Sequence, residues 1–145
     1  MNVSTVRCLA ACLTMSCIAW GDLDKVQAEL RLERRSELAL VHADEELNVA
    51  KKAYEDGEFD AFRRSVNEVG ELAELSLKSL EDTGKRARRS PRYWKRAEQR
   101  MLVLMRRLDG LERAVSIDDR AAVEAARKRV IATHESVLNA IMTKK

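Results

Sequence analysis

Proline, glycine and cysteine are scarce in this 145-residue chain, and their scarcity limits the structures it can adopt. One proline and five glycines stand against abundant Leu, Ala, Glu, Arg and Lys, a composition that favours long helices over sheets. Hydrophobic residues make up 46% of the chain, enough to bury a core, which argues against disorder throughout. The length fits one domain, and we predict an all-α fold.

The first twenty-one residues have the three-part layout of a cleavable secretory signal peptide. Residues 1–7 carry one positive charge, and an uncharged run of 13 residues follows at 8–20. Ala19 and Gly21 then place small residues at the −3 and −1 positions of a cleavage site. The run is shorter than the roughly 20 residues that cross a bilayer. An uncleaved membrane anchor and a buried N-terminal helix are alternative interpretations of this segment. We expect an exported protein, in a periplasm or outside the cell.

The three cysteines, Cys8, Cys12 and Cys17, all lie in this N-terminal segment. Its removal would leave a mature chain without a disulfide, a thiolate metal ligand, a cysteine nucleophile or the attachment site of a c-type haem. Thiol chemistry is thus not expected in the mature protein.

Apolar residues at spacings of three and four predict two helices in the first half of the mature chain. The first covers residues 22–56, of which the stretch 22–37 is expected to project from the core or to fray. The second covers residues 59–82, between Gly57 and Gly84, which end the two helices. The positions expected to form their apolar stripes are Leu40, Ala43, Leu47, Ala50, Tyr54, Phe59, Phe62, Val66, Val69, Leu72, Ala73, Leu77 and Leu80.

Two further helices are predicted after a basic connector. Ser90 is placed to cap the third helix, with Pro91 at its first position, where a missing N–H costs nothing. A turn follows in which Ser116 or Asp118 caps the fourth helix. The expected apolar positions are Trp94, Ala97, Met101, Leu104, Met105, Leu108, Leu111, Val115, Val123, Ala126, Val130, Val137 and Ile141.

Two long antiparallel helical hairpins predict an up-down-up-down four-helix bundle over residues 22–145, because helices joined by short turns pack as antiparallel neighbours. The turns near Gly57 and Asp118 would share one end of the bundle, and the basic connector would lie at the other. We also expect the first and fourth helices to be neighbours.

The net charge of the mature chain is close to zero, but acidic and basic residues are unevenly divided between its two halves. Residues 22–84 hold 17 acidic and 9 basic side chains, whereas residues 85–145 hold 7 acidic and 17 basic ones. Two interpretations stay open: attraction between an acidic and a basic hairpin sets how they pack, or the basic half faces an anionic partner.

The strongest candidate site is the segment 85–96, which we call the basic connector. Seven bases and no acid occur in it, beside Tyr93, Trp94 and a helix N-terminus that also favours anions. Its cations are Lys85, Arg86, Arg88, Arg89, Arg92, Lys95 and Arg96. A phosphate, an anionic lipid surface, a cell-wall polymer or an acidic protein fits this charge. Nucleic acid is not expected, because few exported proteins meet it. A solvated loop whose charges prevent aggregation is the alternative.

The two histidines, His42 and His134, fall at similar depths in the predicted bundle, as a paired-histidine haem or metal site would require. Their faces differ, however, because His134 lies near its apolar stripe and His42 lies off its own. We therefore expect no bound cofactor, and a haem- or metal-binding bundle that uses His134 is kept as an alternative.

Sequence patterns for catalysis are missing. The Glu-x-x-His pairs of carboxylate di-iron bundles do not occur, since Ala39 and Ile131 precede the histidines by three residues. Neither a nucleophile elbow nor a phosphate-cradling glycine loop is found. The sequence therefore gives no reason to expect an enzyme.

Two stretches resemble known proteins. Residues 53–62 (AYEDGEFDAF) resemble the inter-helix turn of a tetratricopeptide repeat, which we interpret as convergent hairpin chemistry because no second copy follows. Residues 79–142, from SLEDTG through RRLD and DDR to IM, are similar to small exported helical proteins found in acidobacterial genomes. That resemblance implies a bacterial envelope or secreted setting and no particular activity.

Together these patterns predict an exported, non-enzymatic interaction module. Its basic connector would contact a protein or an anionic component of the envelope, including a membrane surface. An envelope chaperone-like protein is a further alternative, although the Leu-Thr-x-x-Gln motif of the helical-hairpin chaperones is missing.

Overall fold

The computed structural model describes residues 21–143, so residues 1–20 of the predicted signal peptide, with its cysteines, lie outside the described residues. Helix is the regular secondary structure throughout the described part, and the all-α prediction is confirmed. The helices are α1 (Gly21–Ala28), α2 (Leu32–Glu55), α3 (Phe59–Asp82), α4 (Pro91–Ala114) and α5 (Ile117–Met142). Among these helices, none contains a stretch long and apolar enough to cross a bilayer.

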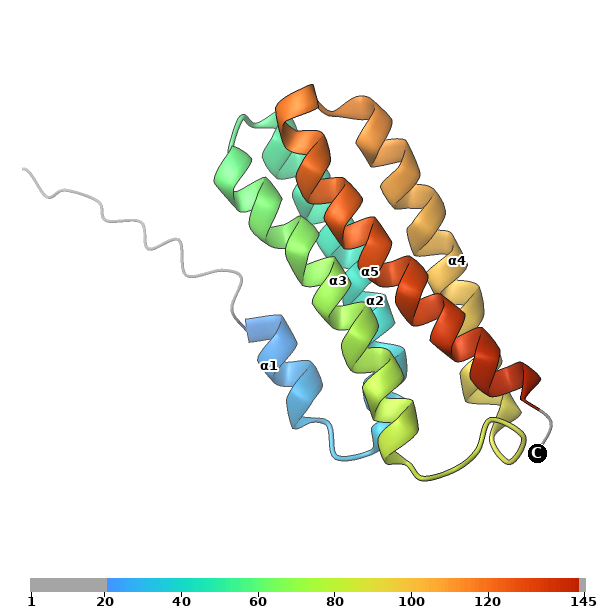
Figure 1. Cartoon of the computed structure of the whole chain (residues 1–145). Helices are drawn as coiled ribbons and strands as arrows, with labels where there is room; N and C mark the ends of the chain where they lie inside the picture. The colour runs from blue at the N-terminus through green and yellow to red at the C-terminus, as the bar shows by residue number, and fades with distance from the viewer. Residues whose placement is uncertain (1–20, 144–145) are drawn as a thin grey trace, which may run out of the picture.

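The four long helices form one bundle, and the chain reverses direction from each of them to the next (Figure 1). The predicted helical bundle is therefore confirmed. Inside it, α2 packs against α3 and α4, and α5 packs against the same two helices, so α2 and α5 lie at opposite corners. The expectation that the first and fourth helices are neighbours is wrong. The connection after α3 passes the start of α2, where Lys85 Nζ lies 2.7 Å from Glu33 Oε1, and so delivers α4 to the side of α2.

The bundle has two distinct ends (Figure 1). The turns α2–α3 and α4–α5 form the turn end. The turn α1–α2, the basic connector and the last residues of α5 form the opposite end, which we call the connector end. The predicted placement of the turns and of the connector at opposite ends is thus confirmed.

The first predicted helix is broken into two. α1 stops at Ala28 and α2 starts at Leu32, because Glu29 holds a turn between them. The Glu29 carboxylate accepts a hydrogen bond from the Arg31 N–H at 3.0 Å, and its carbonyl accepts one from Arg35 Nε at 2.8 Å. α1 folds back onto the bundle and buries Val26, which is only 1% exposed. The expectation that residues 22–37 project or fray is therefore wrong.

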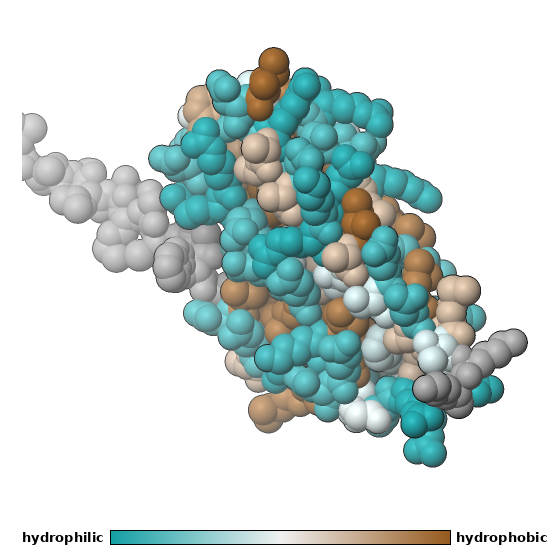
Figure 2. Space-filling view, in the orientation of Figure 1, coloured by the Kyte–Doolittle hydropathy of each residue, from teal (hydrophilic) through white to brown (hydrophobic). Residues whose placement is uncertain are grey.

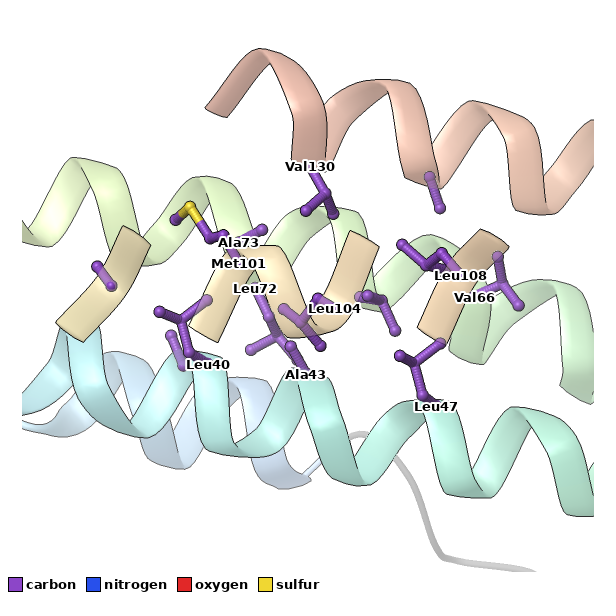
Figure 3. Packing of buried hydrophobic residues seen from close by; sticks show 14 of the residues in the cluster. Leu40, Ala43, Leu47, Val66, Leu72, Ala73, Met101, Leu104, Leu108 and Val130 are labelled. Carbon is purple, nitrogen blue, oxygen red and sulfur yellow. The ribbon is translucent and has the colours of Figure 1, made fainter. Parts of the chain in front are cut away.

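Large apolar side chains from all four long helices meet along the bundle axis (Figure 3). The side chains of greatest volume that are fully enclosed are Phe62, Leu40, Leu72, Leu80, Met101, Leu104 and Leu108. Together with the smaller buried residues of the core, which include Val123, Ala126, Val130 and Val137 of α5, they recur at helical spacing, so each long helix turns one apolar face inward. The predicted stripes are confirmed at most positions. Phe59 is an exception, with 46% of its surface exposed, because it lies at the first residue of α3.

At the turn end, aromatic rings join α2 to α3, and a hydrogen bond joins this first hairpin to the second. The Tyr54 ring packs edge-on against Phe59 and tilted against Phe62, with centroids 5.6 and 5.1 Å apart. Its hydroxyl accepts a hydrogen bond from the backbone N–H of Ser116 at 2.8 Å. Between the first two rings, Gly57 adopts a φ of 78°, which reverses the chain within three residues.

Two glycines give a matched test of this backbone geometry. Gly57→Ala is expected to lower the free energy of unfolding by about 1–2 kcal/mol, because an L-residue is strained at positive φ. Gly110→Ala, inside α4, is expected to raise it by about 0.5–1 kcal/mol through helix propensity. A Cβ at either position would meet no atom within 4 Å, so packing does not enter. Urea unfolding measures the free energy of unfolding of both variants. If Gly57→Ala raises it, the positive φ assigned to this turn is wrong.

Candidate functional site

The basic connector is an ordered turn anchored from inside the bundle. Gly84, with a φ of 64°, lets the chain leave α3. The carbonyl of Arg86 then accepts hydrogen bonds from the N–H groups of Arg89 and Ser90, at 2.8 and 3.3 Å. Ala87 and Trp94 are 5% and 4% exposed. The connector is therefore fixed by its apolar residues, and most of its cations are exposed to solvent.

The structure divides the seven predicted cations into two groups. Lys85 pairs with Glu33, and Arg96 pairs with Glu37 on the next turn of α2. The other five are exposed, and none of them forms an ion pair with the described residues; they are Arg86, Arg88, Arg89, Arg92 and Lys95. The hydrogen bond between Lys85 and Glu33 raises the pKa of the amine and lowers the pKa of the carboxyl. Lys85 and Arg96 thus hold the connector to α2, and the remaining five cations are available to a ligand.

The start of α4 differs from the prediction in one detail. Pro91 is the first residue of α4, as expected, but the Ser90 side chain makes no capping hydrogen bond. Its carbonyl instead accepts a bond from the Tyr93 N–H at 3.2 Å. The first turn of α4 therefore begins beside Arg92 without a side-chain cap.

Ion pairs line the two seams at which the hairpins meet. Across the α2–α4 seam, Arg107 contacts Asp44 and also donates to Asn48 Oδ1 at 2.6 Å. Across the α3–α5 seam, Arg129 donates from Nε and Nη2 to the two Glu74 oxygens, both at 2.7 Å. Basic side chains of the second hairpin thus meet carboxylates of the first, as the charge difference between the two halves of the sequence suggested.

In one contact of the α3–α5 seam, the acidic residue belongs to the second hairpin and the basic residue to the first. Asp119, only 4% exposed, accepts hydrogen bonds from Arg63 Nε at 3.1 Å and Nη2 at 2.8 Å. Ser116, at the N-cap position of α5, makes no capping bond; its hydroxyl lies 3.0 Å from the second Asp119 oxygen. Sequence reasoning missed this buried carboxylate because its partner, Arg63, is 56 residues away in the chain.

Arg129 reaches Glu74 by crossing α3 at a glycine. A Cβ added to Gly70 would lie 3.1 Å from Arg129 Cδ, a tight contact. The missing side chain therefore makes room for the guanidinium stem. The sequence signal for this crossing was an isolated glycine within a helix, which often marks a close approach.

The two histidines lie on helices at opposite corners of the bundle. His42 Nδ1 lies 3.0 Å from Glu45 on its own helix. His134 is 7% exposed, and its Nε2 has no hydrogen-bond partner, with the nearest carboxylate oxygen, that of Glu98, at 3.6 Å. A shared histidine site, which relied on neighbouring first and fourth helices, loses its basis in this arrangement. Within residues 21–143, no group of three or more His, Cys, Asp or Glu side chains could hold a metal ion.

Surface grooves accompany these contacts. One of about 800 Å³ lies between α2 and α3 beside the start of α1, with Leu23, Val49 and Ala61 in its lining. A smaller one, of about 240 Å³, lies between α2 and α4, where Arg96 and Arg100 border Leu38. The smaller groove extends the basic surface of the connector along α4.

Comparison of the chain with family models, with curated proteins and with solved structures finds no match.

A double-mutant cycle tests whether the seams hold the hairpins together. Arg129→Met is expected to lower the free energy of unfolding at pH 7 by about 1 kcal/mol, a modest value because Glu74 is half exposed and the pair is screened. The bond to Arg129 lowers the pKa of Glu74. The stabilisation is therefore present above the ordinary pKa of a carboxyl group and is lost as the pH falls through the lowered pKa. Urea unfolding between pH 7 and pH 3 should show that the free energy of unfolding of the parent protein approaches that of the variant as the pH falls.

The control cycle uses Lys128 and Glu124, an ion pair within α5 at 2.7 Å. This pair joins no two helices, so Lys128→Met and Glu124→Gln should couple more weakly than Arg129→Met and Glu74→Gln. Equal coupling in the two cycles would contradict this expectation, because the α3–α5 pair would then be no stronger than an ion pair within one helix.

Proposed function

We propose that this chain is an exported, non-enzymatic helical bundle that binds an anionic partner through its basic connector. The observation that carries the proposal is the group of five exposed cations without ion-pair partners among the described residues. They occupy one short, anchored segment at one end of the bundle. Export is supported by the sequence pattern of the first twenty-one residues.

The shape of the connector favours an extended anionic surface over a single small anion. Its cations follow an exposed turn and the first helical turn after it, and neither groove encloses them. Arg86 and Arg89 lie three residues apart in a turn closed by backbone hydrogen bonds. Because the backbone is already ordered, binding costs little backbone entropy, while the long side chains can adapt to several anionic groups.

Ion pairs within the bundle already occupy several basic side chains of the second hairpin outside the connector. Arg107, Arg127 and Arg129 already contact carboxylates of the bundle. An anion at those positions would compete with an existing partner. At Arg88 or Arg92 it would meet a solvated guanidinium, and it would gain a charge-assisted hydrogen bond without breaking an ion pair of the protein.

Charge reversal tests the proposal. The triple variant Arg86→Glu, Arg88→Glu and Arg89→Glu is expected to lose at least about 100-fold in affinity for soluble polyphosphate at low salt, measured by titration calorimetry. Added salt should lower the affinity for polyphosphate more in the parent protein than in the variant, because screening acts on the charges that the variant lacks.

The matched control reverses three exposed arginines outside the connector, Arg64, Arg106 and Arg120. These also form no ion pair with described residues, so both triple variants change the net charge equally. The control should bind polyphosphate within about threefold of the parent. If both variants lose affinity to the same extent, net charge and not the connector is responsible, and the proposal is wrong.

A second candidate function rests on His134. Its buried Nε2, without a hydrogen-bond partner, is a nitrogen that could serve as a haem or metal ligand. A Soret band or a stoichiometric metal in the protein purified from its natural host, lost in His134→Ala, would favour this function over anion binding.

A further inference from the structure

The connector end carries protruding apolar side chains as well as cations. Leu30, in the turn between α1 and α2, is 89% exposed, and Met142, the last residue of α5, is 73% exposed. Both belong to the end of the bundle that holds the basic connector (Figure 1). Figure 2 shows hydrophobic groups protruding at both ends of the molecule, at the turn end as well as at the connector end. The connector end therefore combines unpaired positive charge with apolar groups in water.

Leu30 is presented to solvent by an ordered turn. Glu29 accepts hydrogen bonds from Arg31 and Arg35, and its carboxylate also lies 3.4 Å from Arg34 Nε. These bonds fix the backbone on both sides of Leu30. The leucine projects because the turn is held in this shape, so placing it in an apolar medium requires no rearrangement of the turn.

The two ends of the bundle differ in charge. At the connector end, segments 29–35 and 81–96 hold ten basic and four acidic residues. At the turn end, segments 52–64 and 112–120 hold five basic and seven acidic residues. An anionic surface would therefore attract the connector end and repel the turn end, which orients the molecule before contact.

Resting on the proposed function, we infer that the partner is an anionic lipid bilayer. In this arrangement the bundle stands on its connector end, the connector cations lie among the headgroups, and Leu30 and Met142 enter the interfacial region. Each basic residue near an anionic bilayer adds to the attraction, and each buried apolar side chain adds a term that salt does not screen. The long arginine side chains can keep their charges at headgroup level while their stems cover apolar surface.

A bilayer explains the two kinds of side chain better than an acidic protein does. A protein partner would cover a contiguous, packed apolar patch surrounded by a polar rim. Here Leu30 and Met142 project separately, from a turn and from a helix end, beside exposed arginines. Separate apolar projections within a basic surface suit a fluid partner that moulds around each of them.

Vesicle binding tests this inference on the protein purified after expression of the full chain. The protein should co-sediment with vesicles of phosphatidylglycerol and phosphatidylcholine at low salt, and not with vesicles of phosphatidylcholine alone. The triple variant Arg86→Glu, Arg88→Glu and Arg89→Glu should lose at least about 100-fold in affinity. The triple variant at Arg64, Arg106 and Arg120 should stay within about threefold of the parent.

The apolar contact is tested with a matched pair of leucine and isoleucine positions. Leu30→Ser should weaken binding to the anionic vesicles about tenfold. Ile117→Ser removes an 80% exposed side chain at the turn end and should leave binding unchanged. All these variants share the same N-terminus, so differences between them report only on the substituted positions.

Tryptophan fluorescence tests whether the side chain at position 30 enters the bilayer. With vesicles added, Leu30→Trp should gain a blue-shifted emission protected from acrylamide, relative to the unsubstituted protein, whereas Ile117→Trp should not. If bound Leu30→Trp stays accessible to acrylamide, or Leu30→Ser binds as well as the parent, the insertion of Leu30 is wrong.

The outcomes separate this inference from the function on which it rests. Binding to soluble polyphosphate but not to anionic vesicles would keep the anion-binding function and overturn the bilayer as partner. Binding to neither would overturn both. Vesicle binding that resists charge reversal in the connector would overturn the bilayer inference alone, because the connector would then not be the contact with the bilayer.

Discussion

The arrangement of this bundle depends on the charge difference between its two hairpins. Burial of apolar surface makes four amphipathic helices pack, but many arrangements bury a similar area. Carboxylates of the first hairpin face basic side chains of the second along the α2–α4 and α3–α5 seams. These pairs are formed in the arrangement in which α2 lies beside α4 and diagonal to α5. Individually such pairs contribute little to stability, but an arrangement that faced like charges would be disfavoured.

The same pairing determines which cations remain free. Lys85 and Arg96 lie close enough to α2 to pair with acidic residues there, whereas the five cations between them in the sequence form no such pair. The basic segment thus performs two tasks. Its two paired cations attach it to the bundle, and the attachment holds the unpaired ones at one end of the molecule.

Much of the fold follows from local signals in the sequence. Gly57, Gly84 and Pro91 mark helix ends because each has a backbone preference that does not depend on distant residues. The break at residues 29–31 has no such marker: Glu29 stabilises it through contacts with arginines that would be equally suited to a continuous helix. The neighbours of each helix could not be inferred either, because they depend on which charged faces meet in three dimensions.

The candidate site was predictable to a similar degree. The absence of acids within the basic connector indicated exposed charge, and that part rested on composition alone. The pairing of Lys85 with Glu33 and of Arg96 with Glu37 required the α2–α4 seam. In hindsight, Glu33, Glu37 and Asp44 lie on one stripe of α2, at spacings of four and seven, which is the signature of a face directed at a basic helix.

The bond between the Tyr54 hydroxyl and the Ser116 N–H fixes the register of one hairpin along the other. Sliding the second hairpin by one helical turn, about 5.4 Å, would break this bond and move every seam partner by about four residues. In one direction, Arg107 would leave Asp44, remain beside Asn48 and approach Lys51 and Lys52, so that an attraction would be replaced by a repulsion. A tyrosine at the far end of the molecule therefore also sets the height at which the basic connector stands relative to α2.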